Sequence, residues 1–140
     1  MKILVAVDGS PIATRAARYA DRLAMALAEA PRLVLVHVDA PLLAAAVRRM
    51  GRRNVATYHE ENATYAMRSA TAALRRLHVA FETQCVVGEA AQQIVAAAVD
   101  GKFDLVVMGS HGRGTFSSLF LGSVVTKVLS HSRIPVTVVR

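Results

Sequence analysis

Four glycines in the segment 106–127 give this chain its clearest chemical signal. Three follow an apolar run at short spacing and the fourth stands where a helical apolar pattern begins; they are Gly109, Gly112, Gly114 and Gly122. Glycine has no Cβ, so backbone N–H groups there can approach a ligand closely. A helix N-terminus adds unpaired N–H groups and a partial positive charge, which suit phosphate. The spacing therefore predicts a pocket for the phosphate chain of a nucleotide.

Familiar nucleotide-binding and hydrolase motifs do not match this segment. Gly109–Gly114 has the glycine spacing of a Walker A loop, but Thr115 and Phe116 stand where lysine and serine or threonine are needed. The dinucleotide-binding pattern fails because its third glycine would fall on Ser117. No Gly-x-Ser-x-Gly nucleophile elbow occurs in the sequence. We therefore expect nucleotide binding by a different loop, and we name no catalytic residue.

The histidines and the single cysteine show no metal-binding pattern. His59 opens a stretch like that of a zinc-protease helix, but the second histidine is missing. Cys85 is the only cysteine, so no intrachain disulfide can form, and its neighbours are typical of a plain strand. We therefore expect no metal site built from the protein's own side chains.

Apolar runs and helical apolar spacing alternate along the whole chain. Five buried strands are predicted, at residues 2–7, 33–38, 81–87, 104–108 and 135–139. Helices are predicted at residues 11–30, 58–78, 89–100 and 123–131. This alternation predicts an α/β fold: an open parallel five-stranded sheet with helices on both faces, three-layered and Rossmann-like, in a single domain of residues 1–140.

The segment between the second strand and the following helix is the hardest to assign. Residues 42–50 could form a short helix, whereas Gly51 and the surrounding arginines favour a flexible crossover. The chain has 17 basic and 10 acidic residues, for a net charge of +7, and its densest basic cluster is 48–53. No aromatic side chains alternate with these arginines to stack on bases, so a solvated connector is the favoured interpretation. We do not expect nucleic acid as a partner, and weak docking stays the alternative.

Polar residues or glycine stand at the carboxyl ends of three predicted strands. These ends are Asp8, Val38–Asp39 and Met108–Gly109. In open α/β sheets, ligands bind beyond the carboxyl ends of the strands, where the strand order reverses. The candidate site residues are therefore expected at one rim of the sheet.

The pattern Gly109-x2-Gly112-x9-Gly122-Ser123, together with Asp8-Gly9-Ser10 after the first strand, closely resembles the universal stress protein family, specifically its ATP-binding subgroup. The resemblance covers essentially the whole chain, including the closing segment 134–140. It implies the Rossmann-like fold of the adenine nucleotide alpha-hydrolases. It does not explain the arginine cluster at 48–53.

The resemblance implies positions for the base and the ribose of ATP. Asp8 would lie beside the ribose and adenine at the end of the first strand. Val38 would offer backbone groups to the adenine edge. Met108 and Gly109 would line the ribose side. Glycine at the last of these positions agrees with the close backbone approach expected there.

The resemblance places the phosphates further along the same loop. Gly112 would let the loop approach them, and Gly122, Ser123 and Val124 would present N–H groups and a hydroxyl to the distal phosphates. We expect His111 to shape the loop or to contact a phosphate rather than to act as a base, because no side chain that would orient it is evident. Arg113 could neutralise phosphate or face solvent. Mg²⁺ or Mn²⁺ bridging the phosphates would be held mainly by ATP oxygens and water.

These implications lead to a cytoplasmic, ATP-binding regulatory module of the stress response that binds nucleotide rather than turning it over rapidly. A slow ATPase or autophosphorylating enzyme and a nucleotide-free dimeric scaffold are the alternatives. The apolar strand 134–139 would form a sheet edge, and the resemblance implies a homodimer through it. No apolar run reaches the roughly 18 residues that span a bilayer, so no membrane partner is expected. The sequence does not distinguish ATP from AMP or a cyclic nucleotide, and it does not identify a downstream protein.

Overall fold

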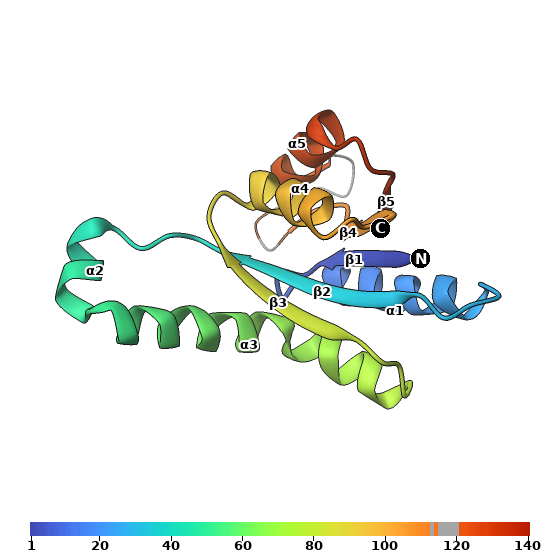
Figure 1. Cartoon of the computed structure of the whole chain (residues 1–140), viewed down its shortest axis with the longest axis horizontal. Helices are drawn as coiled ribbons and strands as arrows, with labels where there is room; N and C mark the ends of the chain where they lie inside the picture. The colour runs from blue at the N-terminus through green and yellow to red at the C-terminus, as the bar shows by residue number, and fades with distance from the viewer. Residues whose placement is uncertain (113, 115–120) are drawn as a thin grey trace.

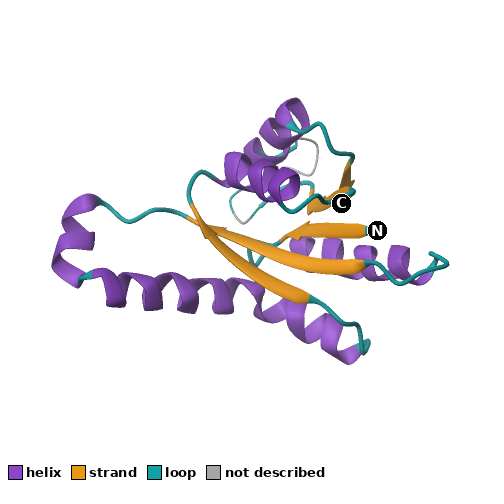
Figure 2. Cartoon of the chain, viewed as in Figure 1, coloured by secondary structure: helices purple, strands orange, loops and turns teal. Residues whose placement is uncertain are grey.

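The computed structural model describes residues 1–112, 114 and 121–140. Strands and helices alternate in it as the sequence predicts, except that two successive helices connect β2 to β3 and the first helix ends at Met25 rather than at residue 30 (Figures 1 and 2). In chain order the elements are β1 (Lys2–Ala6), α1 (Pro11–Met25), β2 (Arg32–Asp39), α2 (Ala44–Met50), α3 (Arg52–Arg76), β3 (Glu82–Val87), α4 (Ala90–Asp100), β4 (Leu105–Gly109), α5 (Ser123–His131) and β5 (Val136–Val139). Among these elements, no helix combines the length and the apolarity needed to cross a lipid bilayer.

The five strands form one sheet in the order β3-β2-β1-β4-β5, and every pair is parallel. Figure 1 shows α1 and α3 on one side of the sheet and α4 and α5 on the other. The predicted three-layer fold is thus confirmed. The chain builds β1 to β3 outward in one direction and then returns to place β4 on the other side of β1. The order therefore reverses between β1 and β4, which is where a ligand site is expected.

Two hydrophobic cores lie on the two faces of the sheet because successive side chains of a strand point to opposite sides. In β1, Ile3 and Val5 pack with α1 and α3, while Leu4 packs with α4 and α5. All three side chains are fully buried. Burying a side chain of this size contributes about 1.5–3 kcal/mol. The central strands are thereby fixed, and their carboxyl ends are held at one rim.

The start of α1 follows the sequence closely. The Ser10 hydroxyl accepts a hydrogen bond from the N–H of Ala13 at 3.1 Å, and Pro11 occupies the first helical position. A serine cap satisfies one of the N–H groups that a helix start leaves unpaired. Gly9 just before it has φ +88°, a backbone conformation that favours glycine. Four residues, Val7 to Ser10, therefore connect the end of β1 to the start of α1.

The crossover between β2 and β3 differs from the prediction. The favoured flexible crossover is instead a short helix, α2, followed after Gly51 by α3, which begins at Arg52 rather than near Tyr58. Gly51 has φ +78°, so the chain turns sharply there. No proline or glycine stands between Arg52 and Tyr58, so a helix that is nucleated by packing further along extends back to the glycine.

Candidate functional site

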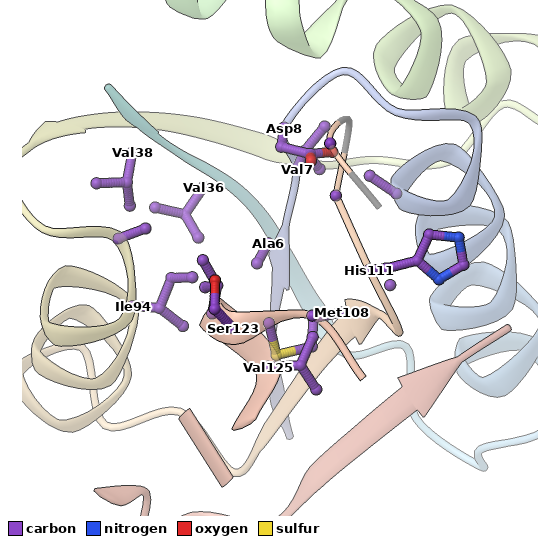
Figure 3. Close-up of a pocket in the computed structure, with 17 residues that line it drawn as sticks. Ala6, Val7, Asp8, Val36, Val38, Ile94, Met108, His111, Ser123 and Val125 are labelled. Carbon is purple, nitrogen blue, oxygen red and sulfur yellow. The ribbon is translucent and has the colours of Figure 1, made fainter. Parts of the chain in front are cut away.

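A cavity of about 350 Å³ opens at the carboxyl ends of β1, β2 and β4 (Figure 3). It lies at the point where the strand order reverses, and the starts of α4 and α5 close it from above the sheet. Its wall consists of Ala6, Val7, Asp8, Ala13, Val36, Val38, Ala90, Ile94, Met108, Gly109, His111, Gly112, Gly114, Gly122, Ser123, Val124 and Val125. The volume falls in the range of small-molecule sites, about 300–1,000 Å³.

Every binding residue inferred from the sequence lines this one cavity. The set is Asp8, Val38, Met108, Gly109, His111, Gly112, Gly122, Ser123 and Val124. Residues that are far apart in the chain meet here because parallel strands end at the same rim. Arg113, for which the sequence left two roles open, lies outside the described residues.

One part of the wall is apolar, and sequence reasoning missed most of it. Figure 3 shows Val36, Val38 and Ile94 grouped on one side of the cavity, with Met108 and Val125 below them. Val38 and Met108 were expected at the site, whereas Val36, Ile94 and Val125 have the sequence pattern of ordinary core positions of strands and helices. These residues differ from core residues only in lying close to the carboxyl ends of the strands, where the cavity opens. The result is a surface that suits a flat apolar ring.

Asp8 and Gly112 lie against each other at the polar end of the cavity. The Asp8 carboxylate accepts a hydrogen bond from the N–H of Ser10 at 2.9 Å. A Cβ added to Gly112 would lie 2.7 Å from Oδ2 of Asp8, closer than van der Waals contact allows. Glycine is therefore required at 112 for this carboxylate to keep its position.

The N-terminus of α5 forms another part of the polar wall. Gly122 is its N-cap, and no side chain of the described residues caps the helix. The N–H of Gly122 donates to the carbonyl of Ser110 at 2.8 Å, and a Cβ on Gly122 would lie 3.1 Å from Cα of His111. Glycine at 122 thus lets the loop after β4 and the start of α5 come together. The N–H groups of the first turn remain available to an anion.

Gly109 has a packing role that the resemblance does not imply, and His111 makes a contact within its own loop. A Cβ on Gly109 would lie 2.5 Å from Cγ2 of Ile12, so glycine there lets α1 pack against β4. His111 is half-buried, and its Nδ1 lies 3.0 Å from the hydroxyl of Ser110. Among the described residues, no carboxylate forms a hydrogen bond or an ion pair with this imidazole. These contacts support a loop-shaping role over that of a base.

The starts of α4 and α5 both reach the cavity, but they differ in charge. At α4, the Glu89 carboxylate accepts the N–H of Gln92 at 2.8 Å and also pairs with Lys127 of α5 at 3.1 Å. The Gln92 N–H first, and then the Lys127 ammonium, hold the pKa of the Glu89 carboxyl below its ordinary value. The carboxylate of Glu89 therefore already neutralises the N-terminus of α4. No acidic residue lies in the first turn of α5, so its N-terminus can still interact with an anion.

Asp39 ends β2 beside Val38, yet it does not line the cavity. Its Oδ2 accepts hydrogen bonds from Nδ1–H of His59 at 2.7 Å and from the Asn62 amide at 2.8 Å, both on α3. Burial raises the pKa of the Asp39 carboxyl, but the bonds from Asn62, His59 and the N–H of Ala40 outweigh burial, so the pKa lies below its ordinary 3.8. Asp39 therefore anchors α3 on the opposite face of the sheet.

Solved structures with this fold include universal stress proteins. UspA from Lactobacillus plantarum aligns with a TM-score of 0.81 at 21% identity, covering 100% of this chain and 97% of that one. Another universal stress protein, solved in complex with cAMP, aligns with a TM-score of 0.67 at 25% identity, again covering 100% and 97%. The sheet and its flanking helices are thus the UspA-like, adenine nucleotide alpha-hydrolase fold.

Sequence comparison agrees with the fold. A universal stress protein of Thermus aquaticus is 35% identical over 146 residues, covering 99% of this chain and 97% of that protein. The sequence model described as the universal stress protein family matches residues 1–140. With the glycine loop, the helix start and the whole length of the chain all in agreement, this protein belongs to the universal stress protein family.

Proposed function

We propose that this protein is of the ATP-binding kind and that it works by binding nucleotide rather than by rapid turnover. One observation carries the proposal. A single cavity has an apolar wall and, next to it, a glycine-lined loop beside the uncapped start of α5. A purine nucleotide has the same two halves, a flat ring and a chain of anionic phosphates.

The adenine ring is assigned to the apolar wall. Val36 and Val38 of β2, Ile94 of α4 and Met108 of β4 provide branched and thioether side chains on which a flat ring packs. Asp8 lines the same cavity and lies against Gly112 of the glycine loop, and its carboxylate is an acceptor for ribose hydroxyls. The backbone of Val38 is assigned to the polar edge of the base.

The phosphates are assigned to the loop after β4 and to the start of α5. Gly112, Gly122, Ser123 and Val124 line that end of the cavity. The N–H groups of the first helical turn and the hydroxyl of Ser123 are donors that anionic oxygens prefer. Glu89 already fills the start of α4, so we infer that the phosphate chain runs toward α5.

The residues present fit a divalent cation that is carried in by the nucleotide. Among the described residues, no three histidine, cysteine, aspartate or glutamate side chains are close enough to hold a metal. Asp8 is the one acidic residue in the described cavity wall. Mg²⁺ or Mn²⁺ would be held mainly by phosphate oxygens and water, as Mg²⁺ commonly is at nucleotide sites. When bound, the cation would neutralise phosphate charge.

We also propose a cytoplasmic homodimer that acts on a downstream protein. β5 pairs with β4 on one side only, and among the described elements no strand covers its other edge. An open edge of apolar residues pairs readily with a second copy. Sedimentation velocity on the purified protein is expected to show a dimer, and a monomer at every concentration would contradict this part of the proposal.

Release of bound small molecules tests nucleotide binding directly. Protein purified without added ligand is denatured, and the supernatant is analysed by mass spectrometry. We expect an adenine nucleotide. Titration of stripped protein with Mg-ATP, AMP and cAMP then ranks the ligands, and ATP is expected to bind most tightly. At a hundred times Kd, ATP would stabilise the fold by about 2.7 kcal/mol. No adenine nucleotide and no thermal shift at millimolar Mg-ATP would overturn the proposal.

A further inference from the structure

The crossover from β2 to α3 projects away from the sheet and bears a dense positive charge. We call residues 40–58 the basic arm. Figure 1 shows α2 and the first turns of α3 extending beyond the end of the sheet. α2 has no buried residue, and the buried residues of α3 begin only at His59. Nothing in the nucleotide cavity uses this arm, since none of its residues lines the cavity.

The charge of the basic arm is unopposed. Its elbow at Gly51 is flanked by Arg48, Arg49, Arg52 and Arg53, all exposed, and no acidic residue stands between Asp39 and Glu60. No carboxylate of the described residues forms an ion pair with any of these arginines. Four guanidinium groups thus lie within six residues, at the tip of a projection from a chain of net charge +7. Such a tip attracts polyanions.

The elbow is a folded structure rather than a loose connector. Val47 and Met50 of α2 and Val55 of α3 are half-buried, while the arginines between them are exposed. The N–H of Gly51 donates to the carbonyl of Val47 at 3.0 Å, and the Asn54 amide donates to the carbonyl of Met50 at 2.9 Å. The backbone that carries the arginines is therefore fixed before any partner arrives, which lowers the ordering cost of binding.

The chemistry of the arm indicates what it binds. The planar guanidinium group matches phosphate oxygens in a two-pronged geometry. Insertion into a lipid surface needs a band of large apolar side chains, but the arm exposes only Leu43 and Tyr58 of that kind among its described residues. Binding of unpaired bases needs aromatic side chains between the charges, and the elbow has none. We propose, in place of the solvated connector favoured from the sequence, that the basic arm binds the phosphate backbone of duplex nucleic acid without reading its sequence.

Salt dependence gives the proposal a numerical test. The intact protein is titrated into a fluorescent 24-base-pair DNA duplex between 50 and 200 mM KCl. If the four arginines neutralise four phosphates, the slope of log K against log salt is about −3.6. The double variant Arg52→Gln/Arg53→Gln should reduce that slope to about −1.8 and weaken binding at least tenfold at the lowest salt.

A matched control lies on the same helix. Arg75→Gln/Arg76→Gln removes the same charge from the exposed far end of α3 and should leave the slope unchanged. Equal losses in both variants would show attraction to net charge alone and overturn the assignment to the arm. Absence of duplex binding, or arm-dependent binding only to vesicles with 30% phosphatidylserine, would also overturn it. Both variants should keep parental affinity for Mg-ATP, so the test is independent of the nucleotide proposal.

Discussion

Oδ2 of Asp39, at the end of β2, lies 2.7 Å from Nδ1 of His59, the first buried residue of α3. Both side chains are largely buried, with 17% and 10% of their surfaces exposed. The contact therefore fixes the base of the arm to β2. The residue before Asp39 in this strand, Val38, lines the cavity. Two adjacent residues of β2 thus face the cavity and α3, on opposite sides of the sheet.

Replacing Asp39 by alanine should destabilise the protein and make its free energy of unfolding depend less on pH in the acid range. The variant loses hydrogen bonds to a buried carboxylate and is expected to lower the free energy of unfolding by about 1.5–3 kcal/mol at pH 7. Because folding lowers the pKa of this carboxyl, its contribution is complete above the ordinary 3.8 and is lost as pH falls through the folded value. Urea denaturation at pH 7 and pH 3 measures both effects.

The exposed carboxylate of Asp100 on α4 provides the control. Asp100→Ala should leave the free energy of unfolding at pH 7 within about 0.5 kcal/mol of the parent, as surface substitutions commonly do. If Asp39→Ala has an effect no larger than this, the cluster with His59 and Asn62 does not anchor α3.

Gly112→Ala should weaken nucleotide binding through Asp8. The new methyl group would lie 2.7 Å from the Asp8 carboxylate and displace it. We expect a loss of about tenfold in affinity for Mg-ATP, equivalent to about 1.4 kcal/mol. Asp8→Ala should cost a similar factor, because the proposed ribose contact is lost. Isothermal titration calorimetry measures both.

The double variant Asp8→Ala/Gly112→Ala tests whether the two effects share one cause. With the carboxylate removed, the methyl group at 112 has room, so the double variant should bind no more weakly than Asp8→Ala alone. Additive losses would show that Gly112 serves the ligand directly and that its contact with Asp8 is incidental.

Much of the lining of the candidate site could be predicted from the sequence because its polar residues stand where strands and helices end. Gly112 and Gly122 interrupt apolar patterns, and such interruptions are visible without a structure. Ile94 and Val125 could not be predicted, since a lining residue and a core residue have the same apolar periodicity. Asp39 could have been placed by parity: Val38 faces the cavity, so its neighbour faces α3. The early start of α3 could not, because packing further along the helix overrides weak local preference.

Gly122→Val should abolish retention of nucleotide while preserving the fold. The backbone at 122, with φ −64° and ψ 155°, is open to any residue, but a Cβ there would lie 3.1 Å from Cα of His111. The branched side chain would force the loop away from the start of α5. Replacing a favourable N-cap residue by an apolar one lowers the free energy of unfolding by about 1 kcal/mol, a loss that a folded domain tolerates. Mass spectrometry of released ligand and circular dichroism measure the two outcomes.

Ala96→Val, on the exposed surface of α4, adds similar bulk away from the cavity and should retain nucleotide at the parental level. If the Gly122 variant also retains ligand at parental affinity, the phosphates do not bind at the start of α5.

Glu89→Gln should strengthen binding of Mg-ATP. The glutamine keeps an acceptor for the N–H of Gln92 but removes a negative charge from a helix start whose next residue, Ala90, lines the cavity. It also releases Lys127, which the carboxylate holds at 3.1 Å. Because the pKa of Glu89 is lowered, the parental side chain is fully charged at pH 7. The parent and the glutamine variant therefore differ by one full negative charge at this position. We expect a gain of about two- to fivefold in affinity at low salt.

Two controls, binding at high salt and a variant of Lys127, distinguish this charge effect from a change in structure. In 0.5 M KCl the gain should largely vanish, because exposed charges are screened within a few ångströms at high salt. Lys127→Gln keeps the Glu89 carboxylate and removes the cation, so it should weaken rather than strengthen binding. If Glu89→Gln binds Mg-ATP with unchanged affinity at 20 mM salt, the carboxylate at the start of α4 does not act on the phosphates. The direction assigned to the phosphate chain would then be supported by the start of α5 alone.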